Sequence, residues 1–373
     1  MKNFCYSIVA VFFGLISCET DFEINAPYQT IPVVYGLLDQ SLDTQWVKIN
    51  RSYLGEGNNV DFAGINDCTQ FNGVIAVIEE YNSNGSLIDV DTLEETYVGD
   101  IDPGLFYQDF QKIYFLATEN DPLNDENEYH LKVNVPAKDL NFDAKTELID
   151  GSQLRFDQWF EQSFLRNGFR MADDDLSSDD YLMGVQVKWL SATNAKRYEL
   201  MMRFHFIEHW VNGDTVKRYV EWGLGSKEGI SVDYSGEELT KNIVATSFYD
   251  MISSKLSSYS NEDQVVKRTL INDSNNIEFI LTAGNEVFNT YMKVNEPVTG
   301  IVTERPIFTN VNNGVGLFAS KYKKSINSYM AVNSILELCL GERTGHLKFC
   351  CDSVNYYNAI IELDAKGYDV TCD

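Results

Sequence analysis

Apolar and polar residues alternate in short runs through the first third of the chain. This is the period of a β-strand that buries one face, and turn-forming residues separate the runs. The clearest turn is Asn82-Ser83-Asn84-Gly85-Ser86, which predicts a hairpin. The alternation predicts strands at residues 31–37, 46–49, 73–81, 87–90, 113–117 and 129–133. Several short strands joined by turns favour an antiparallel β-sandwich over residues 31–137.

One pair of residues supports this prediction. Leu123 precedes Tyr129 across a polar turn. The spacing is similar to the tyrosine corner of immunoglobulin-type sandwiches, in which a tyrosine hydroxyl holds the connection between the sheets.

Residues 138–180 break the alternation. Their apolar side chains recur at helical spacing, namely Phe156, Trp159, Phe160 and Phe164, and Gly168 follows as a C-cap. An acidic run, Asp173–Asp180, comes next. We interpret the region as a connection between two domains or an insertion before the second. Trp159 and Phe160 are candidates for a surface that stacks on a sugar or anchors a protein partner, although packing in a core is the commoner role of such residues.

Longer alternating runs fill the second part of the chain, residues 181–373. Residues 198–210 are apolar at almost every second position, and Asn212-Gly213 predicts a hairpin into a return strand. The order Val185-x-Val187-x-Trp189, a turn, Ala195 and Tyr198-x-Leu200 resembles two strands of a fibronectin type III domain.

The remaining patterns predict two helices and several short strands. Ser235-Gly236-Glu237-Glu238 has the form of a capping box and predicts a helix that continues to Leu256. A second helix is predicted over residues 285–294, and strands at 277–281, 317–320, 336–340, 347–349 and 359–363. The predicted fold is therefore mainly β with a few helices. An immunoglobulin- or fibronectin-like N-terminal sandwich is followed by a larger β-rich C-terminal domain with a helical insertion.

Composition narrows the choice of partners. The chain has 373 residues, which favours two domains. It carries 56 acidic against 29 basic residues, a net charge of −27. Such a charge repels nucleic-acid phosphates and anionic lipid surfaces, so we expect no nucleic-acid partner. It is compatible with a cation or a basic partner, and with solubility alone.

No set of residues identifies a reaction. The sequence has no Gly-x-Ser-x-Gly elbow and no glycine-rich phosphate loop. His205 and His209 fall on one predicted strand, about 13 Å apart at ~3.3 Å per residue, and cannot share a metal ion. The run Asp173–Asp180 offers oxygen ligands for calcium but lacks the glycine and final glutamate of an EF-hand loop, so a solvated connector is the simpler interpretation. We therefore assign no catalytic, cofactor-binding or metal-ligating residue.

The N-terminus resembles a bacterial lipoprotein signal. Lys2 and an apolar stretch from Tyr6 to Ile16 lead into the lipobox-like run Leu15-Ile16-Ser17-Cys18. The stretch is shorter than the roughly 20 residues that span a bilayer, and its layout is that of a secretory signal. The resemblance implies a signal peptide at residues 1–17, acylation of Cys18, and a tether at residues 18–30. A plain signal peptide cut elsewhere is the alternative.

A more specific resemblance comes from two motifs. Residues 306–318 (PIFTNVNNGVGLF) and 284–291 (GNEVFNTY), together with the lipobox, are similar to a family of outer-membrane lipoproteins from Bacteroidota that carry an uncharacterised conserved domain. The resemblance implies a place in the outer membrane, beside a TonB-dependent transporter. The acidic residues after Cys18 resemble the signal that exports such proteins to the cell surface: Glu19, Asp21 and Glu23. The resemblance brings no catalytic residues.

The first of these motifs contains a glycine- and asparagine-rich loop. Asn310, Gly314 and Gly316 are candidates for a ligand or partner surface. The simpler interpretation is a tight turn before the strand at Leu317, because glycine and asparagine accept positive φ.

Export makes disulfides possible. Outside the first 18 residues the cysteines number five, so at least one is unpaired: Cys68, Cys339, Cys350, Cys351 and Cys372. The last four could form two bridges, either Cys339–Cys350 across a predicted hairpin with Cys351–Cys372, or the swapped pairs. Cys68 is then the free thiol. Alternatively, none forms and the cysteines are small buried apolar residues.

These patterns favour a surface-exposed, non-enzymatic outer-membrane lipoprotein that binds an extracellular ligand or assists a TonB-dependent transporter. One alternative is a structural or adhesion protein of the cell envelope. The other is a carbohydrate-active enzyme whose acidic pair is hidden among the many acidic residues.

Overall fold

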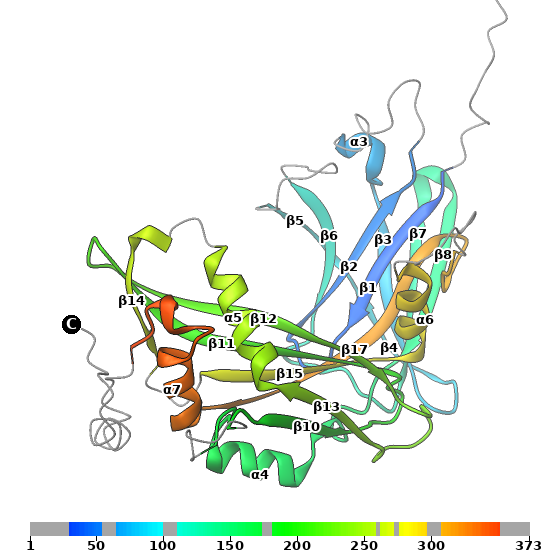
Figure 1. Ribbon diagram of the computed structural model, residues 1–373. Helices are drawn as coiled ribbons and strands as arrows, with labels where there is room; N and C mark the ends of the chain where they lie inside the picture. Colours follow the sequence, from blue (N-terminus) through cyan, green and yellow to red (C-terminus); the bar gives the residue numbers. More distant parts are fainter. Residues whose placement is uncertain are drawn as a thin grey trace, which may run out of the picture.

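The computed structural model describes residues 30–53, 65–99, 110–173, 181–258, 262–271, 276–296 and 307–350. Strands dominate these residues, and the fold is mainly β with a few helices, as the sequence predicts (Figure 1). No helix in the described ranges is both long and apolar enough to cross a membrane.

A single nine-stranded sheet runs through the whole molecule. Its strands follow the order β12-β11-β15-β17-β1-β2-β6-β5, and β14 also pairs with β11. Their bounds are β12 Thr215–Glu228, β11 Arg197–Trp210, β15 Ile277–Gly284, β17 Val315–Ser328, β1 Pro32–Leu38, β2 Thr44–Arg51, β6 Gln111–Ala117, β5 Glu94–Val98 and β14 Val265–Leu270.

The part of this sheet from β1 to β5 forms an N-terminal sandwich with a five-stranded sheet of order β16-β8-β7-β3-β4. The bounds of these strands are β16 Val311–Asn312, β8 Leu140–Glu147, β7 Glu128–Val135, β3 Ile75–Tyr81 and β4 Leu87–Thr92. Alternate residues of both sheets meet in one core, among them Val34, Val47, Ile78 and Leu131. We call this part, together with the short helices α3 (Asn66–Thr69) and η1 (Pro136–Lys138), the N-terminal unit.

The other end of the long sheet shares a core with a three-stranded sheet, β13-β10-β9, and with most of the helices. This is the C-terminal unit. Its further elements are β9 Arg155–Phe156, α4 Gln158–Asn167, β10 Gly184–Leu190, β13 Glu238–Val244, α5 Ala245–Ser257, η2 Glu262–Gln264, α6 Glu286–Asn295, α7 Val332–Leu340 and η3 Gly345–Leu347. In Figure 1, α4 lies beside β10 at the lower side of the molecule, and α6 lies against β17.

Strand β17 joins the two units. Its first half pairs in parallel with β1, and its second half pairs antiparallel with β15. Phe318 therefore lies in the N-terminal core and Ile326 in the C-terminal core. Gly316 allows the close approach to β1: its φ is +122°, and a Cβ there would lie 1.9 Å from the Val34 carbonyl oxygen.

Side-chain hydrogen bonds tie the units together beside β17. The Asn285 amide donates to Thr146 Oγ1 at 2.8 Å, and the Ser320 hydroxyl donates to the Glu147 carbonyl at 2.7 Å. Asn194 donates to the Leu148 carbonyl at 2.9 Å. The units thus share a strand and a set of polar contacts.

Each unit contains a tyrosine corner. In the N-terminal unit the Asn124 N–H donates to the Tyr129 hydroxyl at 2.7 Å, and that hydroxyl donates to Glu80 Oε1 at 3.0 Å. This confirms the corner expected from Leu123 and Tyr129. In the C-terminal unit the Ala192 N–H donates to the Tyr198 hydroxyl at 3.0 Å, within the segment that resembles fibronectin type III. Burial raises the pKa of Tyr198 to about 12.

Residues 138–173, the described part of the predicted connection over residues 138–180, do not form a separate connection, so that prediction is wrong here. Strand β8 pairs with β7 along its whole length and belongs to the N-terminal sandwich. Leu148 lies in the N-terminal core and the next residue, Ile149, in the C-terminal core. Phe156 and Phe160 also belong to that second core, so the chain passes between units within a few residues.

The helix predicted to open at the capping-box-like run 235–238 is also wrong. Residues from Glu238 to Val244 form β13, which pairs with β10. The Glu237 carboxylate accepts the Ile230 N–H at 2.8 Å instead of capping a helix. Pairing with a neighbouring strand outweighs a local capping signal here. The predicted apolar face does form a helix, α5, but it begins at Ala245.

Near the C-terminus the prediction of strands at 336–340 and 347–349 is wrong. The first segment lies in α7 and the second starts within η3. The run from Ser334 to Cys339 is buried on all sides, and a short run without period does not distinguish a buried helix from a buried strand. The predicted hairpin around Gly341 is therefore not formed. The strand predicted at 359–363 lies outside the described residues.

Candidate functional site

A groove lies between α4 and β10, with a volume of about 570 Å³. It is the α4–β10 groove below. Its lining comes from α4 with the residues around it, from the start of β10, and from the start of β13: Asp157, Trp159, Phe160, Ser163, Phe164, Asn167, Gly168, Arg170, Met183, Gly184, Val185, Gln186, Lys188 and Glu238. This size and mixture of apolar and polar groups are those of a small-molecule site.

Local sequence fixes the helix that forms one wall. The Asp157 carboxylate accepts the N–H groups of Trp159 and Phe160, both at 3.0 Å, which caps the N-terminus of α4. Gly168 ends the helix with φ of 70°, as predicted. The cap sets the rotation of the first turn, and with it the directions of the two aromatic side chains that follow.

Trp159 and Phe160 point in opposite directions, one to solvent and one to the core. Phe160 is 9% exposed, and its ring lies 5.5 Å from Phe164 and 6.1 Å from Phe279 of β15. Trp159 is 81% exposed. Of the two residues predicted as a candidate surface, Phe160 mainly packs in the core and Trp159 is presented to solvent at the edge of the groove.

The charged groups of the groove are paired. Lys188 Nζ lies 3.0 Å from Glu238 Oε1, and Arg170 lies 2.8 Å from Asp173. The Gln186 amide donates to Asn242 at 3.0 Å. These polar side chains of the groove therefore already have partners within the protein.

The loop with Asn310, Gly314 and Gly316 lies outside the α4–β10 groove, and its contacts mainly stabilise the fold. The Asn310 side chain accepts the Phe318 N–H at 2.9 Å and donates to the Phe318 carbonyl at 2.6 Å. Gly314 and Gly316 lie against the backbone of β1; a side chain would fit tightly at Gly314 and would clash with Val34 at Gly316. The prediction that this segment turns the chain before the strand at Leu317 is confirmed, with β17 beginning at Val315.

Asn310 also lines a second cavity of about 430 Å³ at the junction of the two units. Most of its other lining residues have polar or charged side chains: Glu128, Lys145, Thr146, Glu147, Asn194, Val232, Asn285, Glu286, Val287 and Asn312. Lys145 pairs with Glu128 at 2.7 Å, and Asn285 bridges the two units. These contacts assign the residues a structural role.

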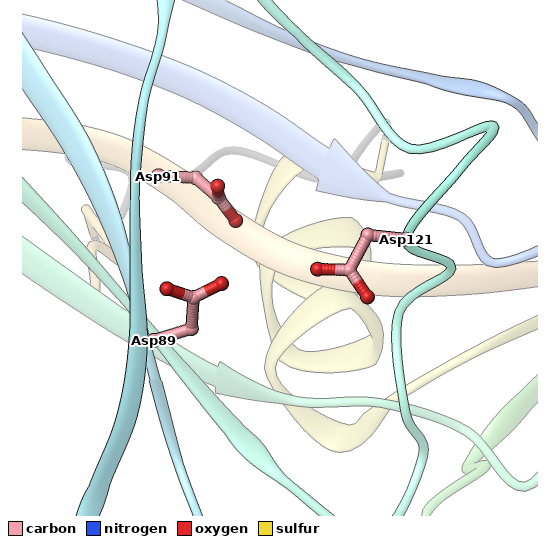
Figure 2. Close-up of side chains that lie close together, drawn as sticks. All are labelled: Asp89, Asp91 and Asp121. Carbon is pink, nitrogen blue, oxygen red and sulfur yellow. The ribbon is translucent and has the colours of Figure 1, made fainter.

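Three carboxylates gather on the N-terminal unit. Asp89 and Asp91 are separated by one residue on β4 and face the same side, and Asp121 points toward them from the segment between β6 and β7 (Figure 2). Their oxygens lie within 4.8 Å of one another. Desolvation and the charges of Asp89 and Asp121 raise the pKa of Asp91. Oxygen ligands suit Ca²⁺, but exposed acidic groups commonly gather without an ion, and we assign no metal.

Sequence reasoning missed this cluster. The Asp-x-Asp pattern on a predicted strand could have identified two of its members. Asp121 joins them only through the fold. The acidic run that sequence did single out lies outside the described residues except for Asp173, which pairs with Arg170.

Three of the four histidines have partners on the same or a neighbouring strand. His205 Nε2 lies 3.2 Å from Glu278, and His209 Nε2 lies 2.9 Å from Thr269, both from β11 to a neighbouring strand. The prediction that they share one strand is confirmed. His130 lies 2.9 Å from Glu128, on β7.

Cys68 is a free thiol, whereas Cys339 and Cys350 are disulfide-bonded. The hairpin that suggested a direct Cys339–Cys350 bridge is not formed, because Cys339 lies on α7. Cys351 and Cys372 lie outside the described residues, as do Cys18, Glu19, Asp21 and Glu23.

Comparisons with known proteins add little. No family model and no curated protein matches the chain. Among solved structures, the chain is similar to the C-terminal globular domain of the oligosaccharyltransferase from Pyrococcus abyssi, with 9% identity and a TM-score of 0.20. The similarity covers 57% of this chain and 38% of that one, and at this TM-score it carries no argument.

Proposed function

We propose that this protein is a lipid-anchored protein of the outer membrane that faces the cell surface and binds an extracellular ligand or assists a TonB-dependent transporter. The lipobox-like run ending at Cys18 supports the anchor, and the motifs at residues 284–291 and 306–318 support the membrane and the transporter. The acidic residues Glu19, Asp21 and Glu23 support the orientation.

The observation that carries the binding role is the exposed Trp159 at the edge of the α4–β10 groove. Large aromatic side chains with an apolar face and a polar edge are enriched where proteins bind partners. The proposed role is binding and requires no catalysis.

Fractionation of cells tests the anchor. Cys18→Ala should abolish acylation and release the protein from the membrane fraction, because the acyl chains on Cys18 are the sole proposed attachment. Cys5→Ala changes a cysteine outside the lipobox and should leave the protein anchored. Absence of lipid mass on the wild-type protein would overturn the anchor.

Two further measurements separate the alternatives. Protease added to intact cells should degrade a protein that faces the surface, and protection would assign it to the periplasm. A transporter should co-purify from solubilised outer membranes, whereas a structural or adhesion protein would be recovered without one. Turnover of a glycan, lost on replacing groove carboxylates, would contradict the non-enzymatic role.

A further inference from the structure

We propose that the α4–β10 groove binds an uncharged carbohydrate, with one sugar ring stacked on the exposed indole of Trp159. The inference rests on the proposed function for the source of the ligand, which is extracellular. It names the ligand class from the chemistry of the groove itself.

The first argument is the position of Trp159. Trp159 is 81% exposed although it lies in the first turn of α4, where the next residue, Phe160, is in the core. The Asp157 cap holds the backbone N–H of Trp159, so the indole projects from a fixed first turn. A rigid indole offers a flat apolar face together with one N–H donor. The C–H face of a pyranose ring is flat and apolar in the same way, and its hydroxyls point outward.

The second argument is local charge. The chain carries −27 overall, yet the groove is lined by two acidic and two basic side chains: Asp157, Glu238, Arg170 and Lys188. Lys188 pairs with Glu238, Arg170 with Asp173, and Asp157 caps α4. The two acidic and two basic groups that line the groove carry no net charge, and a charged ligand would have to compete with one of these existing partners. An uncharged ligand requires no such exchange.

The third argument is the remaining polar rim. Ser163, Asn167 and Gln186 line the groove with hydroxyl and amide groups. These groups both donate and accept hydrogen bonds, as sugar hydroxyls do. Such groups beside one exposed aromatic platform suit a polyhydroxylated ring better than an apolar peptide, which needs a continuous apolar surface.

The experiment uses the full acylated protein, solubilised in detergent and titrated with soluble neutral oligosaccharides: glucans, mannans, galactans and chitin oligomers. Binding is followed by calorimetry and by the quenching or shift of tryptophan fluorescence. Oligogalacturonate serves as the anionic probe and an uncharged apolar peptide as the peptide probe. We expect at least one neutral oligosaccharide to bind, with the anionic and peptide probes binding more weakly.

Variants connect this binding to the groove. Trp159→Ala should weaken binding by about tenfold or more, since it removes the platform. Trp159→Phe retains an aromatic face and should keep part of the affinity. Leu165→Ala is the matched control, because Leu165 is 51% exposed on the same helix and does not line the groove. The melting temperatures of all three should match the wild type.

Three results would overturn the proposal: no neutral oligosaccharide binds, Trp159→Ala binds as tightly as wild type, or the peptide probe binds in preference. The proposed function is judged separately, by acylation and protease accessibility in the same cells. Loss of glycan binding with an intact, surface-exposed anchor refutes the ligand class alone. Glycan binding by a protein without acylation refutes the anchor alone.

Discussion

The two units share an architecture but differ in their cores and in the residues that they expose. Each is a two-layer β structure fixed by a tyrosine corner, and each uses part of the same long sheet. Both cores are mainly aliphatic, but among the described residues the C-terminal core holds nine buried phenylalanines, which contact one another, and the N-terminal core holds three. The exposed features differ as well: the N-terminal unit carries an acidic cluster, and the C-terminal unit carries Trp159. A shared architecture therefore leaves the surface free to specialise.

The largest effect is expected where the units meet. Gly316→Val should prevent β17 from pairing with β1, because the new side chain would overlap the Val34 carbonyl. We expect a loss above about 4 kcal/mol or failure to fold, measured by yield and urea unfolding. Gly213→Ala is the control: Gly213 also has positive φ, but nothing lies within 4 Å of its Cβ position, so only about 1 kcal/mol should be lost. Similar losses in both variants would refute the importance of the close approach.

The two cores can be compared by truncating one ring in each. Phe279 is fully buried and lies 5.3–6.1 Å from Phe160, Phe164 and Phe169, whereas Phe142 has one ring neighbour, Phe71, at 6.4 Å. Phe279→Ala should cost about 3–5 kcal/mol and Phe142→Ala an amount near the lower end.

Because β17 belongs to both units, each of these variants should unfold in one transition. Near-ultraviolet circular dichroism and tryptophan fluorescence should give coincident curves. Two separated transitions would mean that the shared strand does not couple the units.

Removing the tyrosine hydroxyl at each corner should give smaller losses of stability that differ between the two units. Tyr198→Phe should cost about 1–3 kcal/mol, since it leaves the N–H of the buried Ala192 without its partner. Tyr129→Phe should cost less, because Asn124 is exposed and water can replace the hydroxyl. Tyr97→Phe, at an exposed tyrosine, should leave thermal stability unchanged. Equal losses at Tyr129 and Tyr198 would show that exposure of the turn does not matter.

The smallest effect is a stabilisation. The folded-state pKa of Asp91 is raised, so its contribution favours folding below the unfolded pKa and is lost as pH rises through the folded pKa. Asp91→Asn removes the repulsion and should raise the melting temperature slightly at pH 7, measured with a chelator present. The gain should shrink toward pH 3, where Asp91 is protonated. Asp263→Asn, at an exposed carboxylate in the C-terminal unit, should show no such trend.

Sequence was most informative where a pattern is local. Strand periodicity identified β1, β3, β7 and β11, and the spacing of Leu123 and Tyr129 identified a corner that the structure confirms. The helical spacing of Trp159, Phe160 and Phe164, with Gly168 after them, identified α4 and its end. Phe156, which was assigned to the same helical pattern, lies in β9 instead. Alternation, helical spacing and positive φ depend on neighbouring residues alone, and these signals survive in the fold.

Sequence failed where the partner is distant. The capping-box form at Ser235 predicted a helix, but the residues that follow form β13, which pairs with β10. The apolar run of α7 is buried on all sides, so its sequence shows no periodicity that would distinguish a helix from a strand. The exposed state of Trp159 and the buried state of Phe160 follow from the rotation of α4 on the core. Residue type cannot distinguish two adjacent aromatics.

By itself, the sequence determined the β-rich class, the tyrosine corner and the ends of several elements, and it supplied the lipobox-like run from which the anchor is proposed. Tertiary structure alone decided that one sheet passes through both units, that β8 belongs to the first, and that Trp159 borders a groove of balanced charge. Local signals depend on a few covalently linked residues. Strand partners, burial and charge balance depend on residues far apart in the chain, and they are determined only when the whole chain packs.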